Sequence, residues 1–342
     1  MKISLPYLAG ALTLVAALSG LALPASAQTT GGDSEGIVVY NAQHASLTQA
    51  WADGFTRETG IRVTLRNGSD MEFANQIVQE GAASPADVFV TENSPAMVLV
   101  DSAGLFAPLP ADTLAEVPDN YRPAHGRWTG VAARSTVFAF DKTKLTEDKL
   151  PKSLLDLADP TWKGRWAASP AGADFQAIVS ALLDLKGEEA TLSWLKAMKE
   201  NARPYKGNSV AMKAVNAGEV EGAVIYHYYY FGDQAKTGEN SGNVALHYFR
   251  NEDPGAFVSI SGAGVLASSK HQAQAQAFVK WLAGKGGQTV LRDGNSFEYA
   301  IGVDAQSNPK LEPLAKLQAP KIEPSKLNSK KVTDLMTAAG LL

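Results

Sequence analysis

The chain has 342 residues, no cysteine and a formal net charge of −4 at pH 7. Its mild acidity and its lack of a basic cluster argue against nucleic acid as a partner. The absence of cysteine excludes disulfides and a lipid-anchored lipoprotein, so stability must come from core packing.

The first 27 residues have the pattern of a cleaved signal peptide. Lys2 gives a short positive region, residues 8–23 form an apolar run, and Ala25-Ser26-Ala27 supplies the small-residue site of a signal peptidase. The run is short for a transmembrane anchor, which is the competing interpretation. Cleavage after Ala27 leaves 315 residues (342 minus 27) and, by removing Lys2, changes the net charge from −4 to −5. We therefore expect a soluble periplasmic protein with two lobes, because 315 residues exceed what one core usually holds.

Strand and helix signals alternate in the first part of the mature chain. Strands are predicted over 37–40, 61–65 and 87–90 from their β-branched runs. Helices are predicted over 47–58, which Gly60 ends as a C-cap, and over 70–80. Ser94-Pro95 is expected to open the next helix, with the serine as its cap and the proline as its first residue. Successive strand–helix units predict an α/β fold with a mostly parallel sheet covered by helices.

The second part of the chain continues this pattern. Strands are predicted over 137–140, 223–225 and 256–266, and helices over 175–183 and 192–198. The last of these strands follows a turn at Asp253-Pro254-Gly255 and is long enough to cross from one lobe to the other. The tail from Lys310 is expected to pack against a lobe.

Side chains that can bind a metal follow three of the predicted strands. Gln43 and His44 follow the first, Glu92 and Asn93 follow the third, and Tyr226 to Tyr230 follow the strand at 223–225. Ligands of open parallel sheets bind beyond the carboxyl ends of strands. Tyrosine has a pKa near ~10, so it binds a metal at neutral pH only when a strong Lewis acid displaces its proton. Fe³⁺ is the common biological ion that does so, and two phenolates with one carboxylate balance its charge.

Each of these features also has an ordinary structural explanation. A histidine after a strand is often only a hydrogen-bonding group, a glutamate at a helix start favours the helix dipole, and a tyrosine run is often a packing cluster. A cleft for an organic solute, with tyrosines stacked on it, is a second interpretation. A secreted enzyme using His44 and a serine is a third, although no G-x-S-x-G, G-x-G-x-x-G or Walker motif is present.

Several motifs together make the chain similar to a known family. They are Tyr40-Asn41-Ala42-Gln43-His44, the segment 85–92, Trp162-Lys163-Gly164-Arg165, His227-Tyr228-Tyr229 and Asp253-Pro254-Gly255-Ala256. With these motifs, the chain resembles the periplasmic ferric-binding proteins of bacterial iron ABC transporters over nearly all of its mature length.

The resemblance implies a type-II periplasmic-binding-protein fold, with two α/β lobes, an interlobe cleft and hinge strands near Arg134 and near residues 259–262. The lobes are expected to comprise residues 36–134 with 259–308, and residues 135–258 with 309–342. The implied function is to bind Fe³⁺ without catalysis and to deliver it, as a monomer, to an inner-membrane ABC permease. A protein of the same fold that binds a polyamine or thiamine is the alternative.

The resemblance also implies a ligand set. The family's histidine and glutamate ligands fall on His44 and Glu92, and its paired tyrosines fall on Tyr228 and Tyr229. An exogenous anion, often with water, completes the coordination in the family.

The anion site departs from the pattern of the phosphate-using members. Their Ser-Gly-Ala turn aligns here with Gly172-Ala173-Asp174, and one of their two asparagines aligns with Tyr226. Asp174 would place a carboxylate where an anion should lie. We therefore expect carbonate held by Arg134, whose planar fork suits it, with phosphate as the alternative. Asn208 and Asn93 are the other expected anion-binding residues, and Tyr226 is a candidate extra ligand.

Overall fold

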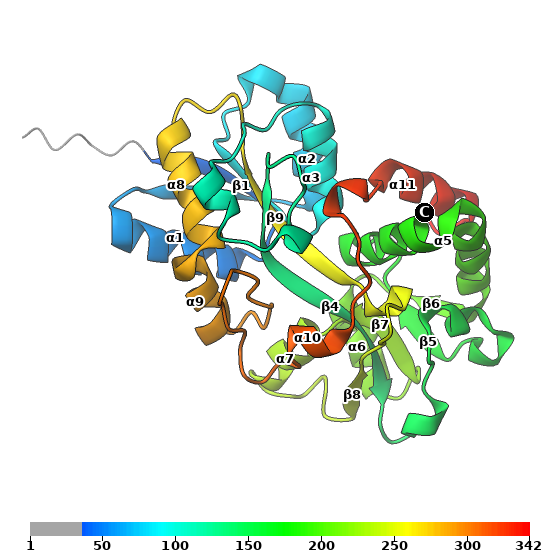
Figure 1. Ribbon diagram of the computed structural model, residues 1–342. Coiled ribbons are helices and arrows are strands. Elements are labelled where there is room, and N and C mark those ends of the chain that lie inside the picture. Colours follow the sequence, from blue (N-terminus) through cyan, green and yellow to red (C-terminus); the bar gives the residue numbers. More distant parts are fainter. Residues whose placement is uncertain (1–35) are drawn as a thin grey trace, which may run out of the picture. The chain divides into compact units, whose positions relative to one another are not determined.

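The computed structural model describes residues 36–342 (Figure 1). The predicted signal peptide and its cleavage site after Ala27 lie outside the described residues. Within residues 36–342, no helix combines the length and the apolar character needed to cross a membrane.

One mixed sheet of nine strands organises the described chain. The strands are β1 (Ile37–Asn41), β2 (Val63–Asn67), β3 (Val88–Val90), β4 (Thr129–Asp141), β5 (Trp166–Ala168), β6 (Ala202–Pro204), β7 (Gly222–Tyr226), β8 (Val244–His247) and β9 (Val258–Val265). Their spatial order is β2-β1-β3-β9-β4-β7-β5-β6, and β8 pairs with β4. The α-helices are α1 (Ala45–Thr59), α2 (Asp70–Glu80), α3 (Ser94–Ser102), α4 (Ala111–Leu114), α5 (Ala173–Asn201), α6 (Asn208–Asn216), α7 (Tyr228–Gln234), α8 (Gln272–Ala283), α9 (Lys285–Asp293), α10 (Leu314–Leu317) and α11 (Ser329–Ala338).

The first three strands and the helices that follow them agree well with the sequence predictions. β1 pairs in parallel with both β2 and β3, and α1 ends at Gly60, whose left-handed φ of 76° suits glycine. β2 begins two residues later than predicted, at Val63. The predicted role of Ser94 is wrong: Asn93 occupies the cap position of α3. The Ser94 hydroxyl donates instead to the Ile260 carbonyl at 2.8 Å, a contact between the start of α3 and β9.

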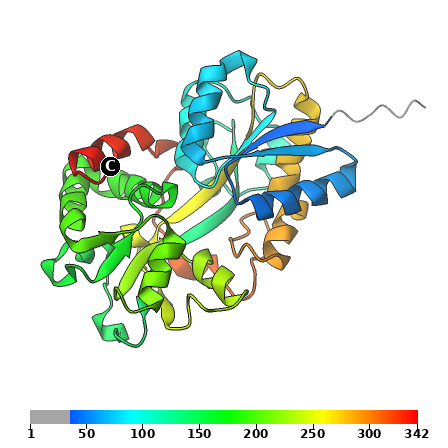
Figure 2. The ribbon, with the colours of Figure 1, turned by 180° about the vertical axis from the view of Figure 1, so that it is seen from behind.

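The two central strands differ from the sequence prediction in length: β9 is shorter than the predicted 256–266, and β4 is longer than the predicted 137–140. β4 extends over 13 residues, and its first part pairs antiparallel with β9, placing Arg134 opposite Ser259. Its second part pairs with β7 and β8. Figures 1 and 2 show β4 and β9 running side by side between the two groups of helices. The sheet is therefore mixed rather than mostly parallel, because these long hinge strands run antiparallel to their neighbours.

The remaining strands form the second half of the sheet. β5 pairs in parallel with β6 and β7. The two helices predicted over 175–183 and 192–198 are confirmed: they lie within α5 on either side of Gly187, whose backbone is not helical, with a φ of 79°. A short 3₁₀ helix, Pro254–Ala256, occupies the predicted turn, and Asp253 caps it. The tail packs against the second half of the molecule through α11, which lies along α5.

Separate apolar cores accompany the two halves. Two core clusters draw on β1, β3, α1, α2, α3 and α8. Two others draw on the second part of β4 and on β5, β7, α5 and α6. Phe297 and Tyr299 belong to the larger of the latter clusters, so the segment around them lies at the junction. The exact lobe limits, 36–134 with 259–308 and 135–258 with 309–342, remain a proposal.

Candidate metal-binding site

The four residues expected to bind a metal lie at the ends of strands and come together. His44 lies at the N-cap position of α1, just after β1. Glu92 lies between β3 and α3, and Tyr228 and Tyr229 are the first residues of α7, just after β7. β1 and β3 are parallel neighbours, so their carboxyl ends, and therefore His44 and Glu92, meet at one edge of the sheet.

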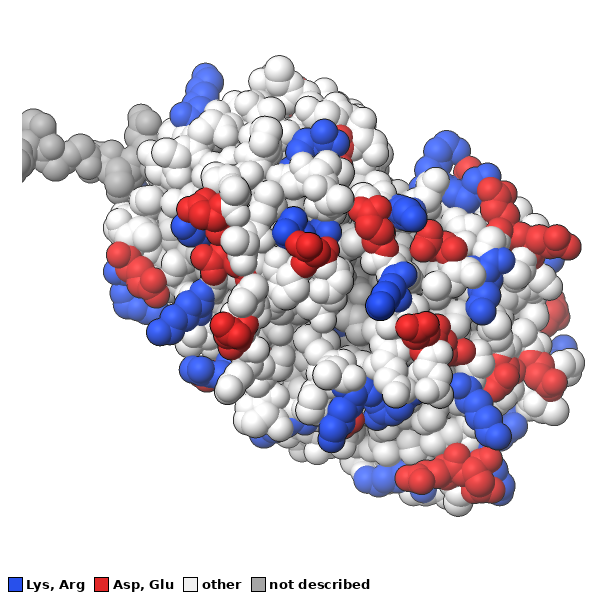
Figure 3. All heavy atoms as spheres, viewed as in Figure 1, with Lys and Arg blue, Asp and Glu red and all other residues white. Residues whose placement is uncertain are grey.

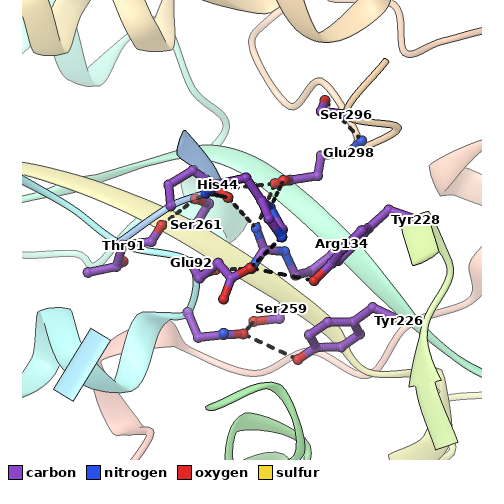
Figure 4. Close-up of polar contacts among 12 residues, drawn as sticks. His44, Thr91, Glu92, Arg134, Tyr226, Tyr228, Ser259, Ser261, Ser296 and Glu298 are labelled. Carbon is purple, nitrogen blue, oxygen red and sulfur yellow. Dashed lines mark hydrogen bonds and ion pairs between the residues drawn. The ribbon is translucent and has the colours of Figure 1, made fainter. Parts of the chain in front are cut away.

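The side chains of His44, Glu92 and Tyr228 contact one another directly (Figure 4). His44 Nε2 lies 3.0 Å from Glu92 Oε1, and the Tyr228 hydroxyl lies 3.5 Å from the same oxygen. The rings of Tyr228 and Tyr229 are neighbours, with centroids 4.3 Å apart. Over residues 36–342, no group of three or more His, Asp or Glu side chains is placed to hold a metal ion.

Asp174 lies at the centre of the cluster and was not predicted as a ligand. It is the second residue of α5 and is only 4% exposed. Its Oδ2 accepts hydrogen bonds from Tyr229 at 3.0 Å, Tyr228 at 3.2 Å and Asn208 Nδ2 at 2.8 Å. Asn93 Nδ2 donates to its other oxygen at 3.0 Å. The two asparagines expected to bind an anion thus bind this carboxylate, and the departure at Gly172-Ala173-Asp174 was the signal in the sequence.

Arg134 is completely buried, and its guanidinium contacts protein groups. Its NH2 donates to Glu298 Oε2 at 2.7 Å and to Gln43 Oε1 at 3.2 Å. Its NH1 donates to the Glu92 carbonyl at 2.6 Å. Glu298 was not predicted, because it is 254 residues from His44 and lies in no recognisable motif.

Tyr226, the candidate extra ligand, ends β7, and the strand does not continue to Tyr228. It is fully buried, and its hydroxyl lies 3.4 Å from Asn93 Oδ1 and 3.3 Å from the Asp174 carbonyl. The Ser259 hydroxyl also donates to Asn93 Oδ1, at 2.7 Å. The Tyr226 side chain therefore packs against Asp174 and Asn93.

The surroundings shift the pKa of each of these groups. Burial disfavours the charged form of His44, but hydrogen bonds to Glu298 and Glu92 outweigh burial and raise its pKa to about 10. Burial raises the pKa of Tyr228 and of Tyr229, and the Asp174 carboxylate raises both further. Burial also acts to raise the pKa of Glu92, but His44 and Arg134 outweigh it and hold that pKa below its usual value. Without a metal at neutral pH, the tyrosines are therefore neutral donors and His44 carries a proton.

A cavity of about 620 Å³ connects the site with the surface. His44, Tyr228 and Tyr229 line it, together with polar residues of α6, α7 and the loop before Glu298. On the face shown in Figure 3, acidic and basic side chains are interspersed, without a broad basic patch.

Comparison with known proteins identifies the family. Residues 83–326 match the family described as bacterial extracellular solute-binding protein. The chain belongs to this family. It is 69% identical to the "Fe(3+)-binding periplasmic protein" of Serratia marcescens, over 95% of this chain and 96% of that one. It is 40% identical to the "Major ferric iron-binding protein" of Neisseria meningitidis serogroup B, over the whole of both chains.

A solved structure of the family has the same fold. The structure of iron-bound HitA from Pseudomonas aeruginosa matches 90% of this chain and all of that chain, with a TM-score of 0.83 and 41% identity. The predicted two-lobe type-II fold of this solute-binding family is thereby confirmed.

Proposed function

We propose that this protein captures ferric iron in the periplasm and delivers it to an ABC permease of the inner membrane. The observation that carries the proposal is a cluster of two tyrosine hydroxyls, one imidazole nitrogen and two carboxylates, joined by contacts of 3.0–3.5 Å. Glu92 contacts His44 and Tyr228, and Asp174 contacts both tyrosines. The names of the relatives in Serratia and Neisseria support it.

The ligand types favour Fe³⁺ over a divalent ion. Both tyrosines have a raised pKa, so only a strongly Lewis-acidic cation displaces their protons. Once deprotonated, Tyr228 and Tyr229 supply two negative charges and Glu92 supplies a third, which balances a trivalent ion. This balance removes most of the penalty of burying the ion. His44, as a neutral ligand, adds a bond without changing the charge.

We further propose that Asp174 takes the place of the exogenous anion. Its carboxylate accepts hydrogen bonds from both asparagines expected to hold an anion and from both tyrosines. Arg134, the expected carbonate-binding residue, directs its NH1 and NH2 groups to Glu92, Glu298 and Gln43 instead. With Asp174 ionised, the ligand charges already exceed that of Fe³⁺ by one. An added carbonate or phosphate would bury a further uncompensated charge.

Iron also explains the two-lobe design. His44 and Glu92 belong to the half of the molecule containing β1 and β3, and Tyr228 and Tyr229 belong to the half containing β7. An ion bound by both sets joins the two lobes, and the closed form is the one a permease would recognise. We propose that the protein acts as a monomer.

The rival functions fit the geometry less well. The ligating groups already lie 3.0–3.5 Å apart, so an ion that replaces protons fits among them, whereas a polyamine or thiamine would have to separate them. The His44 ring hydrogen-bonds to two carboxylates, not to a serine hydroxyl, which gives no support to a hydrolase.

A titration of the metal-free protein with ferric nitrilotriacetate tests the proposal. We expect a broad visible tyrosinate-to-iron band that saturates at one equivalent. Spermidine and thiamine, added to the same protein in a calorimeter, should give no binding heat. A colourless protein that binds either organic solute would overturn the proposal in favour of the alternative.

A further inference from the structure

Glu298 is a buried carboxylate in contact with a proposed ligand of the ion but is not itself part of the ligand set. Its side chain is completely buried. Its Oε1 lies 3.3 Å from His44 Nδ1, and its Oε2 accepts from Arg134 NH2 at 2.7 Å and from Gln43 Nε2 at 3.1 Å. Figure 4 shows Glu298 and Glu92 on opposite sides of the His44 ring.

We propose that Glu298 is a positioning residue that orients His44 for iron and fixes its position relative to the tyrosine ligands. The proposal rests on the function proposed above. Glu298 orients the imidazole of His44, and His44, not Glu298, contacts the ion.

The first part of the argument concerns the two ring nitrogens of His44. A neutral imidazole has one N–H and one lone pair, and the hydrogen bond of one nitrogen determines which tautomer is present. Glu298 is an acceptor beside Nδ1, so it retains the proton there. Nε2, which lies 3.0 Å from Glu92 Oε1, then presents its lone pair to the ion. A carboxylate in this position also makes the imidazole a stronger ligand.

The second part concerns how Glu298 itself is held. Its neighbour Tyr299 exchanges two backbone hydrogen bonds with Ala133 of β4, at 2.8 and 3.0 Å. Its other neighbour, Phe297, has a φ of 56°, a left-handed conformation that is unusual for a bulky residue. Such a conformation persists only where the surrounding contacts enforce it. The Glu298 backbone is therefore fixed against a hinge strand.

The same neighbours connect Glu298 to the tyrosine ligands. The Tyr299 ring stacks on His227, with centroids 4.7 Å apart, and Phe297 stacks on Phe231, with centroids 5.8 Å apart. His227 and Phe231 flank Tyr228 and Tyr229 in the sequence at the start of α7. Residues 297–299 thus contact the helix that carries the tyrosines, while the Glu298 carboxylate holds His44 of the other lobe. When the lobes are closed, Glu298 therefore fixes the position of His44 relative to the tyrosine ligands.

The test compares three variants with a matched control. Glu298→Gln removes the charge while keeping the size, and Glu298→Asp keeps the charge while withdrawing the carboxylate from Nδ1. Asp101→Asn is the control, because Asp101 is also buried and also pairs with a histidine and an arginine, His125 at 2.9 Å and Arg127 at 2.7 Å, outside the site. His44→Ala provides the background for a double-mutant cycle.

We expect both Glu298 variants to weaken ferric affinity by roughly 10–100-fold, as is usual for a group that orients a metal ligand, and the control to leave it unchanged. In the His44→Ala background, the same Glu298 changes should have at least about tenfold less effect. The loss of affinity that remains in the His44→Ala background is the through-space effect of removing the Glu298 charge. Glu298→Asp keeps the charge and should not show this remaining loss.

A spectroscopic measurement separates orientation from simple loss of stability. Protein labelled with ¹⁵N-histidine is loaded with Ga³⁺, a diamagnetic ion of the same charge as Fe³⁺. The wild type and the control should show His44 metal-bound through Nε2 with a protonated Nδ1, and both Glu298 variants should lose this pattern. Equal penalties in both backgrounds, or an unchanged His44 spectrum in both variants, would overturn the inference. A wild type that binds neither ion would instead contradict the proposed function.

Discussion

The role of Asp174 as a resident anion makes a sharp prediction about two substitutions. Asp174→Ala removes the carboxylate and leaves an empty space. The side chains that donate to this carboxylate in the wild type border the space: Asn93, Asn208, Tyr228 and Tyr229. Asp174→Asn removes the charge but fills that space. Both variants should weaken ferric affinity in buffer without bicarbonate or phosphate. Only the alanine variant should recover when either anion is added, because only it has room for the anion.

The magnitude follows from the charge that is removed. A unit charge about 4 Å from another contributes ~4 kcal/mol at an effective dielectric constant of ~20, and Fe³⁺ carries three charges. Water entering the site offsets part of this loss, so we take ~4 kcal/mol as the expected effect. It corresponds to about a thousandfold weaker binding, since ~1.4 kcal/mol is tenfold.

Competition with a ferric chelator, followed in the visible spectrum, measures the affinity of each variant. The wild type should bind equally well with and without added anion. A wild type that requires bicarbonate or phosphate, or an alanine variant with full affinity in anion-free buffer, would refute the assignment of Asp174. Such a result would favour the carbonate site expected from the sequence.

Three further predictions concern the ligands and the lobes. Tyr228→Phe with Tyr229→Phe should abolish the visible band while the protein stays folded by circular dichroism, and His44→Ala should weaken binding less than either tyrosine change; a coloured double variant would contradict this. Ferric binding near pH 7 should release roughly three protons, because His44 has a pKa raised to about 10 and both tyrosines have raised pKa values, so all three are protonated without the ion. Affinity for the free ion should therefore fall as the pH falls. Calorimetry in buffers of different protonation enthalpy counts the released protons, and a count near zero would exclude phenolate ligands. Small-angle scattering should give a smaller radius of gyration for the iron form of the wild type but not for the double tyrosine variant; equal wild-type radii would exclude hinge closure.

Local patterns were sufficient to predict most of the first half of the fold. The helix over 70–80 was predicted to the residue, and Gly60 ends α1 as expected. Both depend on interactions within a few residues, which periodicity and capping report directly. Ser94 was misassigned because its hydroxyl bonds to Ile260, 166 residues away. The length of β4 was underestimated because part of it, Thr129–Ser135, is defined by pairing with β9.

The site shows the same division. His44, Glu92 and the tyrosine pair follow strands directly, so strand ends and ligand chemistry indicated them, and the family resemblance selected among the alternatives. Asp174 gave a weaker signal, a carboxylate in a turn where small and hydroxyl residues were expected. Glu298 gave none, because its significance depends on His44 and Arg134, which fold next to it from distant parts of the chain. Groups that position a ligand depend on tertiary structure and leave no local pattern.

An anomalous difference map, recorded at the iron absorption edge from crystals of the iron-loaded protein, tests the central claim most directly. The account predicts a single strong peak bordered by His44 Nε2, a Glu92 carboxylate oxygen and the hydroxyl oxygens of Tyr228 and Tyr229. A peak at any other place in the molecule, or no peak from a protein that has taken up one equivalent of iron, would contradict it.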